Sequence, residues 1–185
     1  LLALDKQNKT YQNGKSSLGD YVQTLVKTAH SQSTPSIGAF LQALKIERTL
    51  DFQQVARERS LLIDRLSRAL PDDATHVLLA QSLAYRSGQL RSAEFYMGFK
   101  ETCQKNGVPL TNFPAMNEYI RYVLLSEGIN AEDFINDMAS LEKSTYQRLI
   151  RTPQEQTLAT RSRQTVLTQK LVDFALTPSE WKEYK

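Results

Sequence analysis

Hydrophobic residues recur along most of this chain at the three- and four-residue spacing of an amphipathic α-helix. In residues 18–29, for example, one helical stripe carries Leu18, Val22, Leu25, Val26 and Ala29. No segment shows a sustained alternation of apolar and polar residues, so the pattern predicts no strand. It indicates an all-α protein of seven to eight helices joined by short loops.

The longest periodic stretch runs from about residue 36 to residue 70 and contains two apolar stripes that are slightly out of phase. Asp51 lies between the stripes. Aspartate is a favoured N-cap, because its carboxylate accepts hydrogen bonds from the first free backbone N–H groups of a helix. We therefore expect one helix to end and another to begin near Asp51, with a single long helix as the alternative.

Start and stop signals predict several other boundaries. Gly88 is suited to the left-handed position that ends a helix, and Gly107 and Gly128 mark two further corners. Residues 152–155 (TPQE) and 177–180 (TPSE) share a Thr cap, a Pro at the first helical position and a Glu three residues after the cap. This combination is the capping box, so a helix is predicted to begin at each of the two sites.

Short connections favour antiparallel neighbours, and two arrangements satisfy them: a stack of helix hairpins or a closed helical bundle. The stretch 83–96 (LAYRSGQLRSAEFY) resembles the inter-helix turn of a tetratricopeptide-type repeat, with Gly88 at the turn and Ala93 at the close approach. The resemblance implies a superhelical hairpin stack. The resemblance covers a single turn. Tyr85 is one residue away from the usual position of the tyrosine before the turn. A second copy is expected about 34 residues after the first, and Gly128 does not fit that spacing. No family is assigned from it.

Residues 1–17 are polar, and we expect a flexible N-terminal tail there. Residues 18–185 are expected to form a single helical domain, since a chain of 185 residues can bury one good core. The chain begins with Leu1 instead of Met, so we expect a processed or trimmed N-terminus. Aromatic residues in the last turn predict a C-terminal helix that packs on another element or continues beyond Lys185.

Composition changes this picture little. The net charge is +3 and the hydrophobic fraction is 41%, as in ordinary globular proteins. The single cysteine, Cys103, excludes a disulfide within the chain and a metal site made of thiolates alone. No run approaches the roughly 18 apolar residues of a membrane span. We expect a soluble chain, and neither its compartment nor its oligomeric state is indicated.

Motifs that carry chemistry are scarce. His76 follows Asp72 and Asp73 closely, which offers two metal ligands at most, and no His-Glu-x-x-His or Cys-x-x-Cys motif is present. Cys103 has the surroundings of a small buried thiol. There is no phosphate-binding loop, dinucleotide fingerprint or serine-nucleophile motif. We therefore predict no catalytic residue, no metal and no cofactor, and an enzyme is not favoured.

Aromatic residues are concentrated between residues 85 and 122. The stretch 90–105 carries apolar side chains all around its helix axis, which places it between other helices or at an interface. The leading prediction is a non-catalytic protein-interaction or scaffold module that holds a partner segment in an aromatic-lined groove between helices. The predicted partner-binding residues are Tyr85, Tyr96, Phe99, Tyr119 and Tyr122.

Arginines support two alternative functions. Arg59 falls on the apolar stripe of its helix, so it must pair with a carboxylate, reach water or anchor an anion. Arg-rich helix faces favour nucleic-acid or phosphate binding, with Arg59, Arg161 and Arg163 as candidate anion-binding residues. The other alternative is a helical accessory domain of a larger enzyme, in which His76 or Arg59 meets carboxylates with shifted pKa values.

Overall fold

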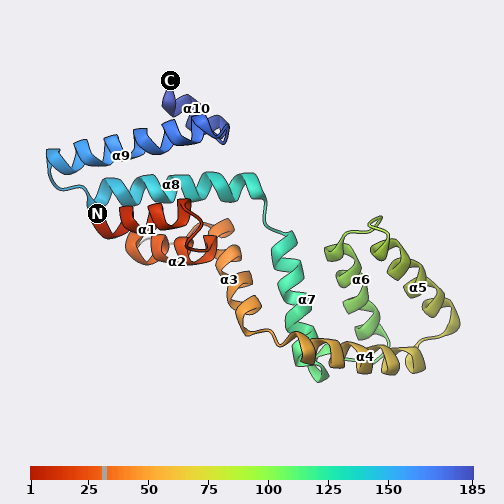
Figure 1. Cartoon of the computed structure of the whole chain (residues 1–185). Coiled ribbons are helices and arrows are strands. Elements are labelled where there is room, and N and C mark those ends of the chain that lie inside the picture. The colour runs from red at the N-terminus through yellow and green to blue at the C-terminus, as the bar shows by residue number, and fades with distance from the viewer. Residues whose placement is uncertain (31–32) are drawn as a thin grey trace. The chain divides into compact units, whose positions relative to one another are not determined.

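The computed structural model describes residues 1–30 and 33–185, and every regular element within them is helical (Figure 1). The predicted all-α class is confirmed. The described residues form ten α-helices and one short 3₁₀ turn, which is more than the seven or eight helices predicted. The chain divides into two compact units. We call residues 33–137 the central unit and residues 1–32 with 138–185 the terminal unit.

The central unit is built from consecutive helices that follow one another closely along the chain. In order they are α3 (Pro35–Thr49), α4 (Phe52–Ala69), α5 (Asp72–Arg86), α6 (Ser92–Lys105), a 3₁₀ turn (Leu110–Asn112) and α7 (Pro114–Glu127). The predicted break near Asp51 is confirmed. The Asp51 carboxylate accepts hydrogen bonds from the N–H groups of Gln53 at 2.9 Å and Gln54 at 3.1 Å, so α4 begins there as a separate helix.

Helix α6 packs against both α5 and α7 and also contacts the 3₁₀ turn. This position explains why α6 carries apolar residues around most of its circumference. Tyr96, Phe99 and Cys103 are buried, whereas Met97 is 55% exposed. The same core receives side chains from α4, from the 3₁₀ turn and the residues flanking it, and from α7, namely Val55, Leu62, Leu66, Val108, Leu110, Phe113, Met116 and Ile120.

The corner between α5 and α6 is made at Gly88, as the sequence predicts. Gly88 has φ = +75°, a conformation that glycine adopts without steric strain. Its N–H donates to the carbonyl of Tyr85 at 3.1 Å, and the N–H of Gln89 donates to the carbonyl of Ala84 at 2.8 Å. These two bonds form a Schellman motif, which satisfies the last carbonyls of α5 and brings α6 back against it.

The terminal unit contains α1 (Leu2–Gln12), α2 (Leu18–Ala29), the larger part of α8 (Ala131–Leu149), α9 (Pro153–Val172) and α10 (Pro178–Tyr184). The segment expected to be a flexible tail forms α1. Leu4 is 3% exposed and packs in one core with Tyr21 and Leu25 of α2. Helix α1 has few apolar residues of its own. Its helical state depends on the packing of Leu4 against α2, so the local pattern of apolar residues does not predict the helix.

Both predicted capping boxes are present. The Thr152 hydroxyl accepts the Glu155 N–H at 3.2 Å while the Glu155 carboxylate accepts the Thr152 N–H at 3.0 Å, and Thr177 and Glu180 make the same exchange. Helix α9 therefore begins at Pro153 and α10 at Pro178, as predicted. Within the described ranges, no helix has the length and apolar character needed to cross a membrane.

Candidate functional site

Five aromatic rings from α5, α6 and α7 are linked by a chain of ring contacts, and we call them the aromatic cluster: Tyr85, Phe95, Tyr96, Phe99 and Tyr119. Tyr85 and Phe95 stack with their ring centroids 4.7 Å apart, and Phe95 is also stacked on Phe99 at 6.0 Å. Tyr96 and Tyr119 meet edge to face at 5.7 Å. Aromatic pairs in these geometries contribute about 0.5–1.5 kcal/mol beyond the area that they bury. The cluster therefore joins three helices through side chains that hold one another in place.

The predicted partner-binding residues occupy two different depths. Tyr96 and Phe99 are each 5% exposed, so in this conformation they form the floor of the cluster. Tyr85 and Tyr119 are half-buried and keep accessible surface. Tyr122 is also half-buried, but it makes no ring contact with any residue that the structure describes. The sequence analysis did not include Phe95 in the site.

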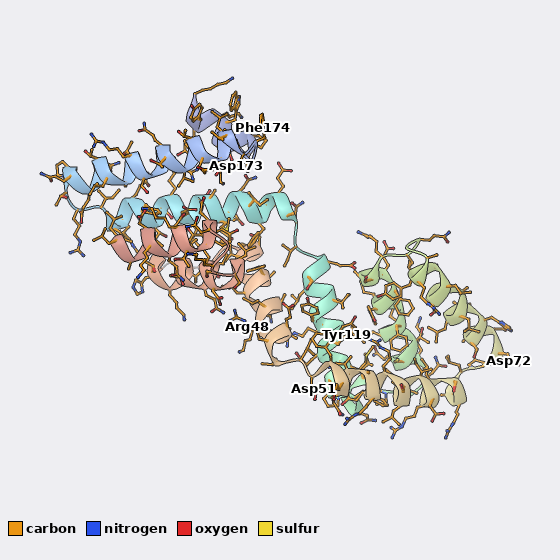
Figure 2. All side chains as sticks on the ribbon, viewed as in Figure 1. Arg48, Asp51, Asp72, Tyr119, Asp173 and Phe174 are labelled. Atoms are coloured by element: carbon orange, nitrogen blue, oxygen red, sulfur yellow. The ribbon has the colours of Figure 1, made fainter. Side chains whose placement is uncertain are left out.

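Arg59 of α4 lies against this cluster. Its guanidinium carbon is 5.3 Å from the centroid of the Tyr119 ring, and Figure 2 labels Tyr119 on α7. The Nε atom of Arg59 is buried and has no hydrogen-bond partner. None of the ion pairs found among the described residues includes Arg59. The cation is thus stabilised by an aromatic face and lacks a carboxylate.

The hydroxyl of Tyr96 stays neutral in this environment. Burial raises the pKa of Tyr96, the neighbouring Tyr119 raises it further, and the positive charge of Arg59 only partly opposes them. A neutral phenol can both donate and accept a hydrogen bond. The aromatic cluster therefore contains a buried, uncharged phenol beside the cation of Arg59.

Two carboxylates from other helices fix the helices that carry the cluster. The N-cap residue of α7, Phe113, provides no side-chain cap, and the buried Glu58 of α4 takes its place by accepting the Met116 N–H at 2.9 Å. The N-cap residue of α6, Arg91, also provides no cap. There the carboxylate of Glu127, at the end of α7, accepts the Ala93 N–H at 2.8 Å.

These contacts have an electrostatic benefit as well as a geometric one. The N-terminus of a helix carries partial positive charge, so an ionised carboxylate is favourable there. In agreement with this, the hydrogen bonds from Ser92 and Ala93 hold the pKa of Glu127 below its ordinary value. The sequence analysis missed Glu58 and Glu127, because neither is near in sequence to the helix start that it caps.

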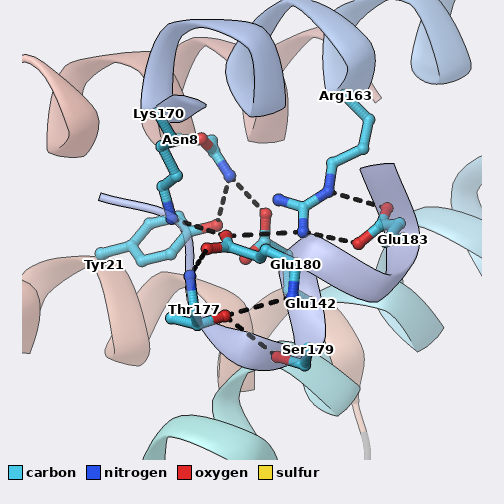
Figure 3. Close-up of polar contacts among 9 residues, drawn as sticks. All are labelled: Asn8, Tyr21, Glu142, Arg163, Lys170, Thr177, Ser179, Glu180 and Glu183. Carbon is cyan, nitrogen blue, oxygen red and sulfur yellow. Dashed lines mark hydrogen bonds and ion pairs between the residues drawn. The ribbon is translucent and has the colours of Figure 1, made fainter. Parts of the chain in front are cut away.

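The terminal unit contains a second group of interacting side chains, shown in Figure 3, which we call the polar cluster: Asn8, Tyr21, Glu142, Arg163, Lys170, Glu180 and Glu183. The side-chain amide of Asn8 donates to the Tyr21 hydroxyl at 2.8 Å and to the Glu142 carboxylate. Burial raises the pKa of Glu142, although the charges of Arg163 and Lys170 oppose the increase. Asn8 thereby connects α1 with α2 and α8.

Ion pairs occupy the cations of the polar cluster. Arg163 donates to both carboxylate oxygens of Glu183, at 3.0 and 2.8 Å, and lies 3.6 Å from Glu180. Lys170 donates to Glu180 at 2.6 Å. The fork-shaped pairing with Glu183 uses the geometry in which guanidinium binds carboxylate best. These contacts attach α10 to α9 and neutralise the positive charge of this part of α9.

The candidate anion-binding residues are therefore not equivalent. Arg59 belongs to the central unit, whereas Arg161 and Arg163 belong to the terminal unit. Arg163 is engaged by carboxylates of α10. Arg161 is exposed and lines a shallow hollow on the surface of α9 together with Gln164, Thr165, Thr168, Gln169 and Val172.

The residues considered for catalysis or metal binding do not converge. Asp72, Asp73 and His76 are exposed on α5. In the part of the chain that the structure describes, no three His, Cys, Asp or Glu residues are grouped so that they could hold a metal ion. Burial raises the pKa of Cys103 to about 11, so its thiol is protonated at neutral pH. A buried neutral thiol is a poor nucleophile.

Known proteins give no further guide to the site. The chain was compared with models of protein families, with curated proteins and with solved structures, and none of the three comparisons finds a match.

Proposed function

We propose that the central unit is a non-catalytic protein-interaction module that binds a partner segment across the aromatic cluster. The observation that carries the proposal is that three half-buried rings from three different helices, Tyr85, Phe95 and Tyr119, each contact the buried ring of Tyr96. Tyr96 and Phe99 provide the buried floor beneath them. Tyr122 is retained from the sequence analysis as a residue at the edge of the binding surface.

The physical properties of the cluster suit recognition of a protein. Tyrosine is enriched among the residues that dominate binding energies, because a large rigid ring buries much area and loses little conformational freedom. The capping contacts of Glu58 and Glu127 hold α6 and α7 before a partner arrives, which reduces the entropy lost on binding. We include in this proposal the predicted hairpin-stack arrangement of α5, α6 and α7, since α6 packs on both neighbours.

Helix α5 also exposes large apolar side chains. No residue of α5 is fully buried, and Leu79 and Leu83 are 57% and 66% exposed. The binding of nucleic acid has weaker support, because Arg163 and Lys170 are paired with glutamates of α10.

The proposal is tested with the full chain in two steps. Partners are first captured from the cells that produce the protein and are identified by quantitative mass spectrometry. The same capture is then made with a Tyr85→Leu/Tyr119→Leu variant, which keeps apolar volume, and with a Tyr184→Leu control on α10. Partners of the aromatic cluster are expected to be lost with the double variant and retained with the control.

A captured partner is then purified, and its Kd for each variant is measured by calorimetry. We expect the double variant to bind at least about tenfold more weakly, which corresponds to about 1.4 kcal/mol. Thermal unfolding of each variant shows that the fold is retained. An unchanged set of partners and an unchanged Kd for the double variant would contradict the proposed function.

A further inference from the structure

We propose that Arg59 binds a carboxylate of the partner segment, and that apolar residues on either side of this carboxylate cover Phe52 and Ile63 of α4. The expected partner segment is an acidic amphipathic helix. This inference rests on the proposed function and names the chemistry of the partner.

The hydrogen-bonding capacity of Arg59 is not satisfied within the chain. A guanidinium presents five N–H donors and no acceptor, and it remains charged in any protein environment. The Nε–H of Arg59 is buried without a partner, and the contact with Tyr119 satisfies the charge only in part. By contrast, Arg68 on the same helix donates to both carboxylate oxygens of Asp64 at 2.8 Å. Arg59 therefore has a buried donor without an acceptor, and it lacks the carboxylate that Arg68 has.

Arg59 shares one face of α4 with two exposed apolar residues. Phe52 precedes Arg59 by seven residues and Ile63 follows it by four, so at 100° per residue all three lie within about 40° on one face. Phe52 and Ile63 are 56% and 52% exposed. At a rise of 1.5 Å per residue they are about 10 Å and about 6 Å from Arg59 along the axis. One face of α4 thus presents an unpaired cation between two exposed apolar residues.

This arrangement selects the partner. A partner helix matches Phe52, Arg59 and Ile63 if its Glu or Asp has one apolar residue four positions away on one side and another seven positions away on the other side. Such a helix would pack on α4 in the helix-to-helix mode of recognition. A nucleic-acid backbone fits poorly, because its phosphates would meet Phe52 and Ile63 beside a single cation. Charge complementarity and the apolar flanks together favour an acidic protein segment.

The first experiment uses small probes on the full chain and observes the Nε–Hε signals of its arginines by ¹H–¹⁵N NMR. The probes are 3-phenylpropionate, its neutral amide 3-phenylpropionamide, and inorganic phosphate. The signal of Arg59 is assigned with Arg59→Lys, which keeps the charge and removes Nε. Arg65 is the matched control, because it lies at the same 5.3 Å from an aromatic ring, that of Phe113, but is exposed.

We expect 3-phenylpropionate to move the Arg59 signal at least threefold further than the amide or phosphate does at equal concentration, and to move the Arg65 signal less. An equal shift with the amide would show that the ring alone is bound and would overturn the inference. A larger shift with phosphate would overturn it in favour of a phosphate ligand.

The second experiment measures the Kd of a partner captured through the aromatic cluster. Arg59→Gln is expected to weaken binding at least about tenfold, because a charge-assisted hydrogen bond is lost, whereas Arg65→Gln stays within twofold. If Tyr85→Leu/Tyr119→Leu weakens binding but Arg59→Gln does not, the carboxylate inference fails and the proposed function stands. If neither variant weakens binding, both fail.

Discussion

The carboxylate of Glu58 in α4 accepts a hydrogen bond of 2.9 Å from the backbone N–H of Met116, in the first turn of α7. Glu58 also accepts the side-chain amide of Gln54 at 3.1 Å. It is 6% exposed, so a charged group has been taken out of water to supply a cap that the sequence around Phe113 lacks. The contact fixes α4 to the start of the helix that carries Tyr119.

Replacement of Glu58 tests the importance of this cap. Glu58→Ala leaves the buried N–H of Met116 unsatisfied, so we expect the free energy of unfolding to fall by about 2–3 kcal/mol. Glu58→Gln keeps an acceptor but loses the charge, and a decrease of about 1 kcal/mol is expected. Urea denaturation followed by circular dichroism measures both. The exposed Glu47→Ala is the control, and a loss in Glu58→Ala no larger than in this control would contradict the assignment.

Acidification is expected to loosen α10. Burial tends to raise the pKa of Glu180, but hydrogen bonds from Lys170 and from the Thr177 N–H, with the charges of Lys170 and Arg163, lower it below 4.5 overall. The pairing with Arg163 likewise lowers the pKa of Glu183. Groups with lowered pKa values stabilise the fold above their unfolded pKa, and this contribution is lost as the pH falls through the folded values.

Trp181 is the single tryptophan of the chain and lies on α10, so its fluorescence reports this change. We expect its emission to shift to longer wavelength as the pH falls below about 4.5. In Glu180→Gln the shift is expected to be largely present already at pH 7. Identical titrations of this variant and the unaltered chain would show that the ion pairs do not hold α10.

Glu142 is expected to behave in the opposite way. Burial raises its pKa above 4.5, so its ionisation is unfavourable in the folded chain. The free energy of unfolding therefore decreases as the pH rises from below 4.5 through the folded pKa. Glu142→Gln removes this penalty, and we expect a Tm higher than that of the unaltered chain at pH 7, with no gain below pH 4.5. The exposed Glu132→Gln is the control, and a lower Tm for Glu142→Gln at pH 7 would refute the prediction.

Phe174 occupies a strained backbone position after α9. Its φ is +52° and its side chain is 97% exposed, so no packing compensates for the strain (Figure 2). A left-handed conformation costs a non-glycine residue about 1–2 kcal/mol. Glycine avoids this cost, but it loses more conformational freedom on folding, and this loss cancels part of the gain. Phe174→Gly is expected to raise the free energy of unfolding by about 0.5–1 kcal/mol in thermal denaturation. Asp173→Gly, at φ = −83°, is expected to give no gain, and equal effects of the two would contradict the explanation.

The fold was predictable wherever its determinants are local. Asp51 and the two capping boxes act within three residues of the helix start, and the sequence analysis placed all three starts correctly. Helix α1 was not predictable, because its main apolar anchor, Leu4, depends on Tyr21 and Leu25. The grouping into two units has a related origin: residues 138–185 pack with the N-terminal helices, and no signal in a single sequence records such distant pairing.

The candidate site was predictable in part. Four of the aromatic residues singled out in the sequence, Tyr85, Tyr96, Phe99 and Tyr119, belong to the cluster, because helix spacing places apolar residues on inner faces. Their depth was not predictable, since it depends on which helices cover α6. The contact between Glu58 and Met116 joins positions 58 residues apart, and periodicity contains no information about such pairs.

The sulfhydryl of Cys103 has a practical consequence. It is fully shielded on α6, and its raised pKa of about 11 keeps it protonated. Alkylating reagents attack thiolates in contact with solvent, so modification of this residue requires α6 to separate transiently from its neighbours. Because the chain has one cysteine, the rate of alkylation measures the opening of the central unit without any engineered label. A ligand that binds only the closed arrangement will slow that reaction, whatever its identity.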